Sequence, residues 1–299
     1  MTSPRMTTRP GGPSFSRIVA GMWRLSEWNM SPQERVRFIQ SCVDLGVTTF
    51  DHADIYGDYR VETLFGEALD LAPELKQRIE LVSKCGIMLT SGQRPDHRLK
   101  HYDTSAAHIV ASVESSLRNL RVDHLDLLLI HRPDPLMNYD EIAATFESLR
   151  AAGKVSHFGV SNFTPAQFDA LNARIALATN QVEFSPLHVA PIEDGTFDGL
   201  QNHGVAPMIW SALGGGKLFE NDTHSWEIRQ TIERIAKRLD VSPTSVIYAW
   251  IMRLPCRALP LTGSGRIEVV HEAVAATGLE LDRQDWFDIL KAARGHDIA

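Results

Sequence analysis

The chain has 299 residues, of which 43% are hydrophobic and 22% are charged, and its formal net charge is −7. This composition is that of an ordinary globular protein, and the length suits one large barrel or two smaller domains. The acidic balance argues against nucleic acid as the main partner, because phosphate backbones are bound by clustered Lys and Arg. The sequence contains no apolar run of about 18 residues, so we expect no membrane span.

The N-terminal segment is rich in Thr, Pro and Gly and lacks the apolar core of a signal peptide. We therefore expect a flexible lead-in over residues 1–16, followed by a single domain over residues 17–299, in a cytoplasmic protein. The three cysteines, Cys42, Cys85 and Cys256, lie in apolar runs and show no metal-ligand spacing. They indicate reduced core thiols and no metal site.

Short apolar segments alternate with amphipathic helical stretches along the chain. Most of these segments are apolar throughout, as in parallel strands that are covered on both faces. The predicted strands are 17–22, 48–51, 80–83, 125–131, 157–160, 179–183, 207–210 and 258–261. Eight strands alternating with helices predict a single-domain α/β fold, a (β/α)8 TIM barrel with an additional C-terminal helix.

A doubly wound sheet is the alternative architecture. That fold normally carries a Gly-x-Gly-x-x-Gly turn after its first strand, whereas the first predicted strand here ends in Gly21-Met22-Trp23. Two segments, 86–105 and 217–226, are longer than ordinary barrel loops. We expect these long loops at the C-terminal face of the barrel, where such loops often act as lids.

Polar side chains stand at the C-terminal ends of the predicted strands, where the active site of a barrel lies. Asp51, Lys84 and His131 end the second, third and fourth strands, and Tyr56 lies in the loop after Asp51. Because Lys and Asp are rarely buried unpaired, we expect Lys84 to pair with Asp51 on the neighbouring strand. A Schiff-base role for Lys84 is the alternative, since barrel aldolases place such a lysine at a strand end.

Two glycine-rich segments follow the seventh and eighth predicted strands. They are Ser211-Ala212-Leu213-Gly214-Gly215-Gly216-Lys217 and Thr262-Gly263-Ser264-Gly265-Arg266. Glycines let the backbone approach an anion closely, and barrels often bind phosphate with the loops after these two strands. The two segments therefore predict a pyrophosphate or adenosine phosphate site.

Four motifs, in this order along the chain, resemble the signatures of the aldo-keto reductase family. They are residues 49–57 (TFDHADIYG), 81–84 (LVSK), 128–133 (LLIHRP) and 159–163 (GVSNF). The resemblance covers the chain from Ile18 to the C-terminal helix. The stretch 131–135 (HRPDP) and the glycine run 213–217 are most similar to the YdhF-type bacterial oxidoreductase branch.

The resemblance implies an oxidoreductase that uses NADPH to reduce aldehydes or ketones to alcohols by hydride transfer. It gives the catalytic roles to Asp51, Tyr56, Lys84 and His131. Tyr56 would be the general acid that protonates the carbonyl oxygen, and the ammonium of Lys84 is expected to lower the pKa of the phenol. His131 would hydrogen-bond the carbonyl oxygen and orient the substrate.

The resemblance also implies which residues bind the nicotinamide end of NADP(H). Ser161, Asn162 and Gln181 would hydrogen-bond the carboxamide, which fixes the face of the ring. The indole of Trp210, at the end of the seventh strand, would stack on the nicotinamide.

At the adenosine end, the guanidinium of Arg266 and the hydroxyl of Ser264 would suit a 2′-phosphate. Glu272 matches the residue of the family that contacts adenine. The other expected cofactor contacts are Gly21, Met22, Ser211, Leu213, Gly215, Lys217, Gly263 and Gly265.

The expected partner is a small-molecule carbonyl substrate. Trp23 and His52 are predicted to line an apolar pocket, which indicates a hydrophobic or aromatic carbonyl, although His52 fits a structural position equally well. No segment resembles an obligate interface, so we expect a monomer. The alternative function is a cofactor-binding regulatory subunit with little turnover, against which the complete set of four catalytic residues argues.

Overall fold

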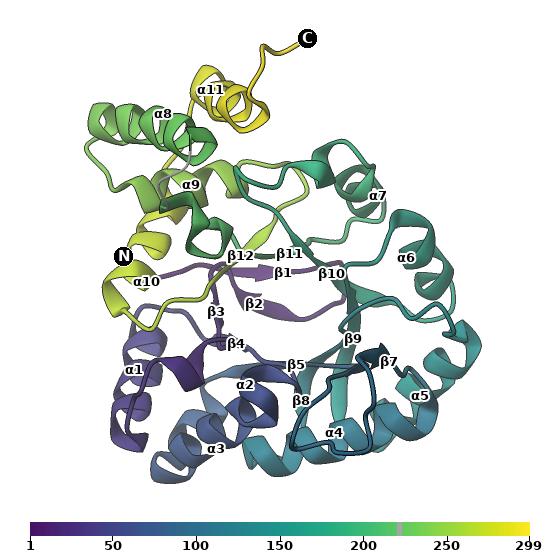
Figure 1. Cartoon of the computed structure of the whole chain (residues 1–299). Helices are drawn as coiled ribbons and strands as arrows, with labels where there is room; N and C mark the ends of the chain where they lie inside the picture. The colour runs from purple at the N-terminus through teal and green to yellow at the C-terminus, as the bar shows by residue number, and fades with distance from the viewer. Residues whose placement is uncertain (220–222) are drawn as a thin grey trace.

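The computed structural model describes residues 1–219 and 223–299. Eight parallel strands close into a barrel in the order β10-β11-β12-β3-β4-β5-β8-β9 (Figure 1). The strands are β3 (Val19–Gly21), β4 (Thr49–Asp51), β5 (Glu80–Cys85), β8 (Leu125–Ile130), β9 (Val155–Ser161), β10 (Leu177–Glu183), β11 (Met208–Trp210) and β12 (Leu259–Thr262). The predicted (β/α)8 barrel is thereby confirmed, and the doubly wound alternative is excluded.

Helices surround the barrel in the order in which the chain supplies them (Figure 1). They are α1 (Pro32–Asp44), α3 (Val61–Leu71), α4 (Ala106–Leu120), α5 (Tyr139–Ala151), α6 (Pro165–Asn172), α7 (Thr196–Asn202), α9 (Pro243–Met252) and α10 (Ile267–Ala275). Two further helices, α8 (Thr223–Leu239) and α11 (Arg283–Arg294), pack on each other beside α9, outside this ring. Among the described residues, no helix is long and apolar enough to cross a membrane.

Several helices begin at capping residues that are visible in the sequence. Ser31 and Thr164 each form a capping box, with Glu34 and Gln167 respectively, and a proline follows each cap as the first helical residue. Ser242 caps α9 in front of Pro243 through a bond from the main-chain N–H of the third helical residue. Local sequence therefore sets where these helices start, and their apolar faces then pack on the barrel.

Gly66 permits the close packing of α3 against α4. A Cβ at this position would lie 2.0 Å from the main-chain oxygen of Asn119 at the end of α4. No side chain fits into that gap, so the backbones of the two helices meet directly.

The N-terminal segment forms a hairpin across one end of the barrel (Figure 1). Strand β1 (Arg5–Thr7) pairs antiparallel with β2 (Ser14–Ser16), and Phe15 is 1% exposed among the residues that fill the barrel interior. The main-chain oxygen of Thr8 accepts a hydrogen bond from the N–H of Ala206 at 2.7 Å. The expected flexible lead-in over residues 1–16 therefore does not describe this segment, because its glycines and prolines serve a tight turn and its one aromatic residue closes the barrel.

The two predicted long loops contain some regular structure. Residues 86–105 hold a short antiparallel pair, β6 (Ile87–Met88) and β7 (His101–Tyr102). Of the predicted loop 217–226, residues 220–222 lie outside the described residues. The chain before them forms the 3-10 helix η4 (Gly214–Phe219), and α8 begins directly after them.

Candidate active site

A buried lysine joins three groups at the carboxyl ends of β4 and β5. The Nζ of Lys84 donates to Oδ2 of Asp51 at 2.6 Å, to the phenol oxygen of Tyr56 at 3.0 Å and to the main-chain oxygen of His52 at 2.8 Å. The side chains of Lys84 and Asp51 are 1% and 2% exposed, so each charge needs the other away from water. The pairing expected from the strand ends is present. Within the described residues, no group of His, Cys, Asp and Glu is arranged to hold a metal.

A left-handed turn presents Tyr56 to Lys84. Gly57, Asp58 and Tyr59 have φ values of 56°, 58° and 64° in the short helix α2 (Tyr56–Tyr59). A Cβ on Gly57 would lie 2.6 Å from Oγ of Ser26. The positive φ and the lack of space for a side chain therefore both require glycine at this position.

Two contacts to the long loop 86–105 hold the non-glycine residues of this turn in their unusual conformation. The phenol oxygen of Tyr59 accepts from the N–H of Leu89 at 3.0 Å, and Asp58 accepts from Ser91. The long loop 86–105 and the turn that carries Tyr56 are therefore physically coupled.

His131 lies directly after β8, and its ring meets that of Tyr56 edge to face at a centroid distance of 5.9 Å. Its Nδ1 is buried and has no hydrogen-bond partner among the described residues. Burial, together with the positive charges of Lys84, Arg132 and Lys100, holds the pKa of His131 well below its usual value of 6.5. The imidazole is therefore neutral at physiological pH, a property that the sequence did not reveal.

The pKa of Tyr56 departs from the prediction. Burial raises the pKa of the phenol above its ordinary value of 10.0, the ammonium of Lys84 opposes this effect, and the carboxylate of Asp51 adds to it. Lys84 thus lowers the pKa of the phenol, as expected, but burial outweighs this contribution and the net direction is upward. The pKa of Lys84 is itself raised: burial lowers it, but Asp51 and Tyr56 together outweigh burial. The pair is therefore an ammonium beside a protonated phenol.

The residues predicted for the nicotinamide form one network across the ends of β9, β10 and β11. Trp210 Nε1 donates to Oδ1 of Asn162 at 3.1 Å, and Asn162 Nδ2 donates to Oγ of Ser161 at 2.8 Å. Ser161 Oγ in turn donates to the main-chain oxygen of Gln181 at 2.8 Å. The side chains of Trp210, Asn162 and Ser161 therefore reach the same patch of the barrel mouth.

The side chain of Gln181 has a role that sequence reasoning missed. Its Nε2 donates to Oδ1 of Asp51 at 2.7 Å, from the other side of the barrel. Asp51 is thus fixed by Lys84 on one carboxylate oxygen and by Gln181 on the other. The only signal for this contact in the sequence was the alternation of side chains along the strand, which turns residue 181 toward the inside of the barrel.

The two glycine-rich loops have backbone geometry that suits a phosphorylated ligand. Ser211, Gly214, Gly215 and Gly216 all have positive φ values. A Cβ on Gly263 would meet no atom within 4 Å, whereas one on Gly265 would lie 2.6 Å from the indole of Trp28.

The second loop leads into α10 at Arg266, and no side chain caps the first turn of this helix. Its N–H groups, the exposed guanidinium of Arg266 and the hydroxyl of Ser264 supply donors of the kind that phosphate groups need. The residues present therefore fit the phosphate groups of a dinucleotide.

The loop after β3 crosses toward the first glycine-rich loop. Arg24 Nη2 donates to the main-chain oxygen of Gly215 at 2.8 Å, and its guanidinium lies 5.2 Å from the ring centroid of Trp23. Trp23 is 54% exposed, in keeping with a residue at the rim of a pocket. Met22 is buried and donates its N–H to the main-chain oxygen of Asp51.

His52 lies in the core rather than at the mouth. It is fully buried, and its ring packs edge to face on Phe65 of α3 at a centroid distance of 4.5 Å. Since Asp51 points into the barrel, the next residue on the strand must point outward to the helices. His52 is therefore misplaced in the predicted substrate pocket.

The remaining predicted cofactor residues lie at the ends of β3, β11 and β12 or on α10. Gly21 ends β3, where a Cβ would lie 3.5 Å from the main-chain oxygen of Thr262. Leu213 is partly buried and Lys217 is exposed, both in or beside η4. Glu272 lies on α10, partly buried, and its main-chain oxygen accepts from Oγ of Ser245 at 2.8 Å.

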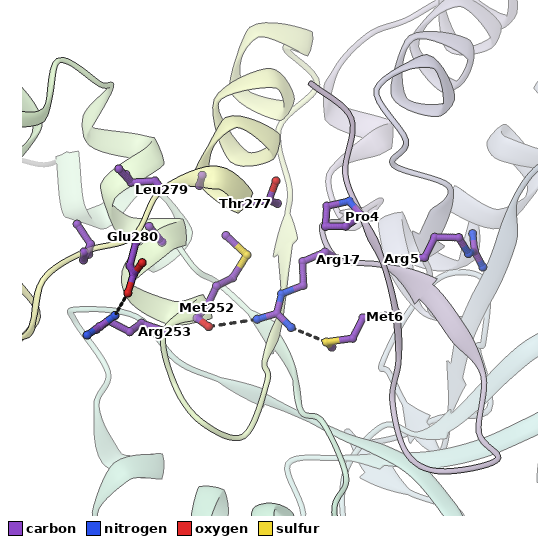
Figure 2. Close-up of a pocket in the computed structure, with 12 residues that line it drawn as sticks. Pro4, Arg5, Met6, Arg17, Met252, Arg253, Thr277, Leu279 and Glu280 are labelled. Carbon is purple, nitrogen blue, oxygen red and sulfur yellow. Dashed lines mark hydrogen bonds and ion pairs between the residues drawn. The ribbon is translucent and has the colours of Figure 1, made fainter.

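A cleft of about 420 Å³ lies away from the barrel mouth, beside the start of β3 (Figure 2). Arg17 donates there to the main-chain oxygens of Met252 and Arg257 at 3.2 and 3.0 Å, at the end of α9. Arg253 pairs with Glu280 at 3.5 Å. Protein groups thus satisfy these charges, and the barrel mouth remains the candidate active site.

Comparisons with known proteins show the family of this chain. The model of the aldo/keto reductase family matches residues 17–294. The chain is 55% identical over 297 residues to oxidoreductase YdhF of Escherichia coli strain K12, which covers 98% of this chain and 99% of the relative. It is 42% identical over 288 residues to a 6-dehydroglucose reductase of Agrobacterium fabrum, which covers 95% and 96%.

The solved structures that resemble this chain have the same fold. The glycerol dehydrogenase AKR11B4 from Gluconobacter oxydans has a TM-score of 0.85 at 24% identity and covers 100% of this chain and 98% of its own. An aldo/keto reductase from Klebsiella pneumoniae, in complex with NADP and acetate, has a TM-score of 0.79 at 24% identity and covers 97% and 94%. The chain therefore belongs to the aldo/keto reductase family, in its YdhF-type branch.

Proposed function

We propose that the protein reduces aldehydes or ketones to alcohols with NADPH and that Tyr56 is its general acid. The observation that carries this proposal is the hydrogen bond of 3.0 Å between the phenol of Tyr56 and the ammonium of Lys84, which is itself paired with Asp51. A proton donor of this kind, at the carboxyl end of a barrel, matches what carbonyl reduction requires.

Tyr56 supplies the proton as negative charge develops on the carbonyl oxygen. Because the pKa of the phenol is raised, Tyr56 carries its proton at neutral pH before the reaction. Once the proton leaves, the ammonium of Lys84 stands 3.0 Å from the new phenolate and stabilises it. Lys84 thus acts where the charge appears in the transition state, which is where stabilisation raises the rate.

His131 orients the carbonyl as a neutral hydrogen-bond donor. Its Nδ1 is buried without a partner among the described residues. Since a buried N–H without an acceptor is rarer than an unpaired acceptor, we assign the ring proton to Nε2. Nε2–H then donates to the carbonyl oxygen, beside the phenol of Tyr56.

The cofactor, when bound, supplies the hydride that attacks the carbonyl carbon. Trp210, Ser161 and Asn162 would hold the nicotinamide, and the two glycine-rich loops would hold the phosphates. The complex of the Klebsiella relative with NADP supports the coenzyme class. For NADPH rather than NADH the support is Arg266 with Ser264, because a guanidinium and a hydroxyl suit a 2′-phosphate.

The test is a panel of aldehydes and ketones, followed by the loss of NADPH absorbance. The panel includes sugar aldehydes, since one relative is named a 6-dehydroglucose reductase. Tyr56→Phe should lose about 10²- to 10⁴-fold in kcat, while NADPH still quenches tryptophan fluorescence. Wild-type turnover in this variant would remove Tyr56 from the proposed role.

Coenzyme choice is tested separately with Arg266→Ala. This variant should weaken the binding of NADPH far more than that of NADH, because only NADPH carries the 2′-phosphate. Equal losses for both coenzymes would show that Arg266 does not read that group.

A further inference from the structure

Arg132 extends across the mouth of the barrel. It directly follows His131 at the end of β8, and its guanidinium carbon lies 5.6 Å from the ring centroid of Trp210, at the end of β11. Strands β9 and β10 separate β8 from β11 in the barrel order. The side chain must therefore pass over the carboxyl ends of two strands, where a substrate has to enter.

The charge of Arg132 is not neutralised by a carboxylate among the described residues. The nearest acidic residue in the sequence, Asp134, is buried and accepts instead from Oγ1 of Thr104 at 3.1 Å and from the N–H of Leu136 at 2.8 Å. Glu183 ends β10 at the same mouth, but no ion pair joins it to Arg132. The aromatic face of Trp210 is a weak substitute for an anion at a partly exposed position.

The positive charge of Arg132 acts on the imidazole of His131. Besides burial and Lys84, Arg132 and Lys100 both contribute to the low pKa of His131. Lys100 lies in the long loop 86–105, is exposed and has no ion-pair partner in the described part of the chain. A protein with a formal net charge of −7 thus keeps an unpaired guanidinium on the residue that directly follows His131, whose imidazole would hold the carbonyl oxygen.

We propose that Arg132, assisted by Lys100, selects carbonyl substrates that carry an anionic group such as a carboxylate. This inference rests on the proposed function and names its substrate class, in place of the apolar carbonyl expected from the sequence. The cofactor phosphates have their own donors after β11 and β12, whereas Arg132 and Lys100 approach from β8 and the loop after β5. Arg132 is thus a specificity-determining residue, because a guanidinium binds a carboxylate through paired hydrogen bonds.

The experiment compares 4-carboxybenzaldehyde with its methyl ester, which differ in charge but present the same aldehyde. With NADPH, the wild type should have a kcat/KM for the acid at least about tenfold above that for the ester, in line with a charge-assisted hydrogen bond. In Arg132→Gln this ratio should fall close to one, in Arg132→Lys it should be intermediate, and in Lys100→Gln it should fall partly. Salt should reduce the ratio in the wild type, because the charges at the mouth are screened.

The control variant is Arg37→Gln on α1, which removes the same charge from a side chain that is 70% exposed on the outer surface. Its ratio should equal that of the wild type. Benzoate and benzamide serve as inhibitor probes in the ester reaction, so that binding is measured even where the acid reacts slowly. Benzoate should inhibit competitively and lose potency in Arg132→Gln, whereas benzamide should bind weakly to both.

The outcomes separate this inference from the function on which it rests. Reduction of the ester at the same kcat/KM as the acid, with benzoate no better than benzamide, overturns the inference and leaves the reductase. An unchanged acid-to-ester ratio in Arg132→Gln also overturns it. Equal loss for both substrates with weaker NADPH binding would assign Arg132 to the cofactor instead. Failure to reduce any carbonyl overturns both proposals.

Discussion

Asp54, two residues before Tyr56, offers a direct test of how burial raises the pKa of a carboxyl group. Its Oδ2 accepts from Oγ of Ser112 at 2.8 Å, while its Oδ1 is buried without a partner among the described residues. Burial first, and then the neighbouring charge of Glu62, raise the pKa of this carboxyl from 3.8 to about 7. The folded protein therefore resists the ionisation of Asp54, and Asp54→Asn removes that cost while keeping an oxygen for Ser112.

The size of the effect follows from the two pKa values. Because the pKa of Asp54 is raised on folding, its contribution to stability is fully present below the unfolded pKa of 3.8. That contribution is lost as the pH rises through the folded pKa of about 7. A pKa difference of about 3 corresponds to about 4 kcal/mol in the free energy of unfolding. Part of the residue reaches solvent, which reduces the effect. We therefore expect the free energy of unfolding of Asp54→Asn to be about 2–4 kcal/mol higher than that of the wild type at pH 8.5, and the difference to be smaller at pH 5.

The assay is urea unfolding, followed by tryptophan fluorescence, of wild type and variant at several pH values from 5 to 8.5. Only the difference in the free energy of unfolding between the two proteins is interpreted, because groups that titrate in both proteins then cancel. Asp123→Asn, at an exposed position before β8, is the matched control and should give a difference that does not depend on pH. A constant difference for Asp54→Asn as well would refute the reasoning, because Asp54 would then ionise as freely in the folded protein as in the unfolded one.

Three other expectations concern the site itself. Lys84→Met leaves Asp51 buried without its cation and should cost about 3–5 kcal/mol in urea unfolding; an unchanged unfolding midpoint would contradict the structural pairing. Reduction requires a protonated Tyr56, whose pKa is raised above 10.0. The kcat/KM for reduction should therefore stay level from pH 7 to about 10 and fall only as the pH passes the phenol's pKa, whereas a decline centred near pH 8 would show that Lys84 outweighs burial. Gly265→Ala places a Cβ 2.6 Å from an indole and should raise the KM for NADPH more than the KM for the carbonyl; equal effects on both would show that this loop does not serve the cofactor.

The barrel and the meeting of the candidate catalytic side chains were predictable from the sequence for one physical reason. Parallel strands in a closed barrel all end at the same rim, so polar residues that follow apolar segments must converge there. The pairing of Lys84 with Asp51 followed from the cost of burying either charge alone. The resemblance to the family then singled out Tyr56 and His131 from the other polar residues at the strand ends.

Other features could not be predicted because they depend on which face a residue occupies. His52 and Asp51 are neighbours in the sequence, but one packs on α3 and the other enters the barrel. Gln181 looked like a cofactor residue, and only the closed barrel brings its amide to Asp51, 130 residues away along the chain. The N-terminal hairpin has a composition that suits a flexible segment equally well, and its position is set by Phe15 entering the barrel interior.

The pKa of Tyr56 shows why a set of candidate catalytic residues does not by itself give their protonation states. From the sequence, a lysine beside a tyrosine suggested a lowered pKa of the phenol, because only the attraction between ammonium and phenolate was considered. The fold adds two opposing effects, namely the burial of the phenol and the negative charge of Asp51. In the proposed mechanism, Lys84 therefore stabilises the phenolate after proton transfer rather than producing it beforehand, and this places its contribution in the transition state.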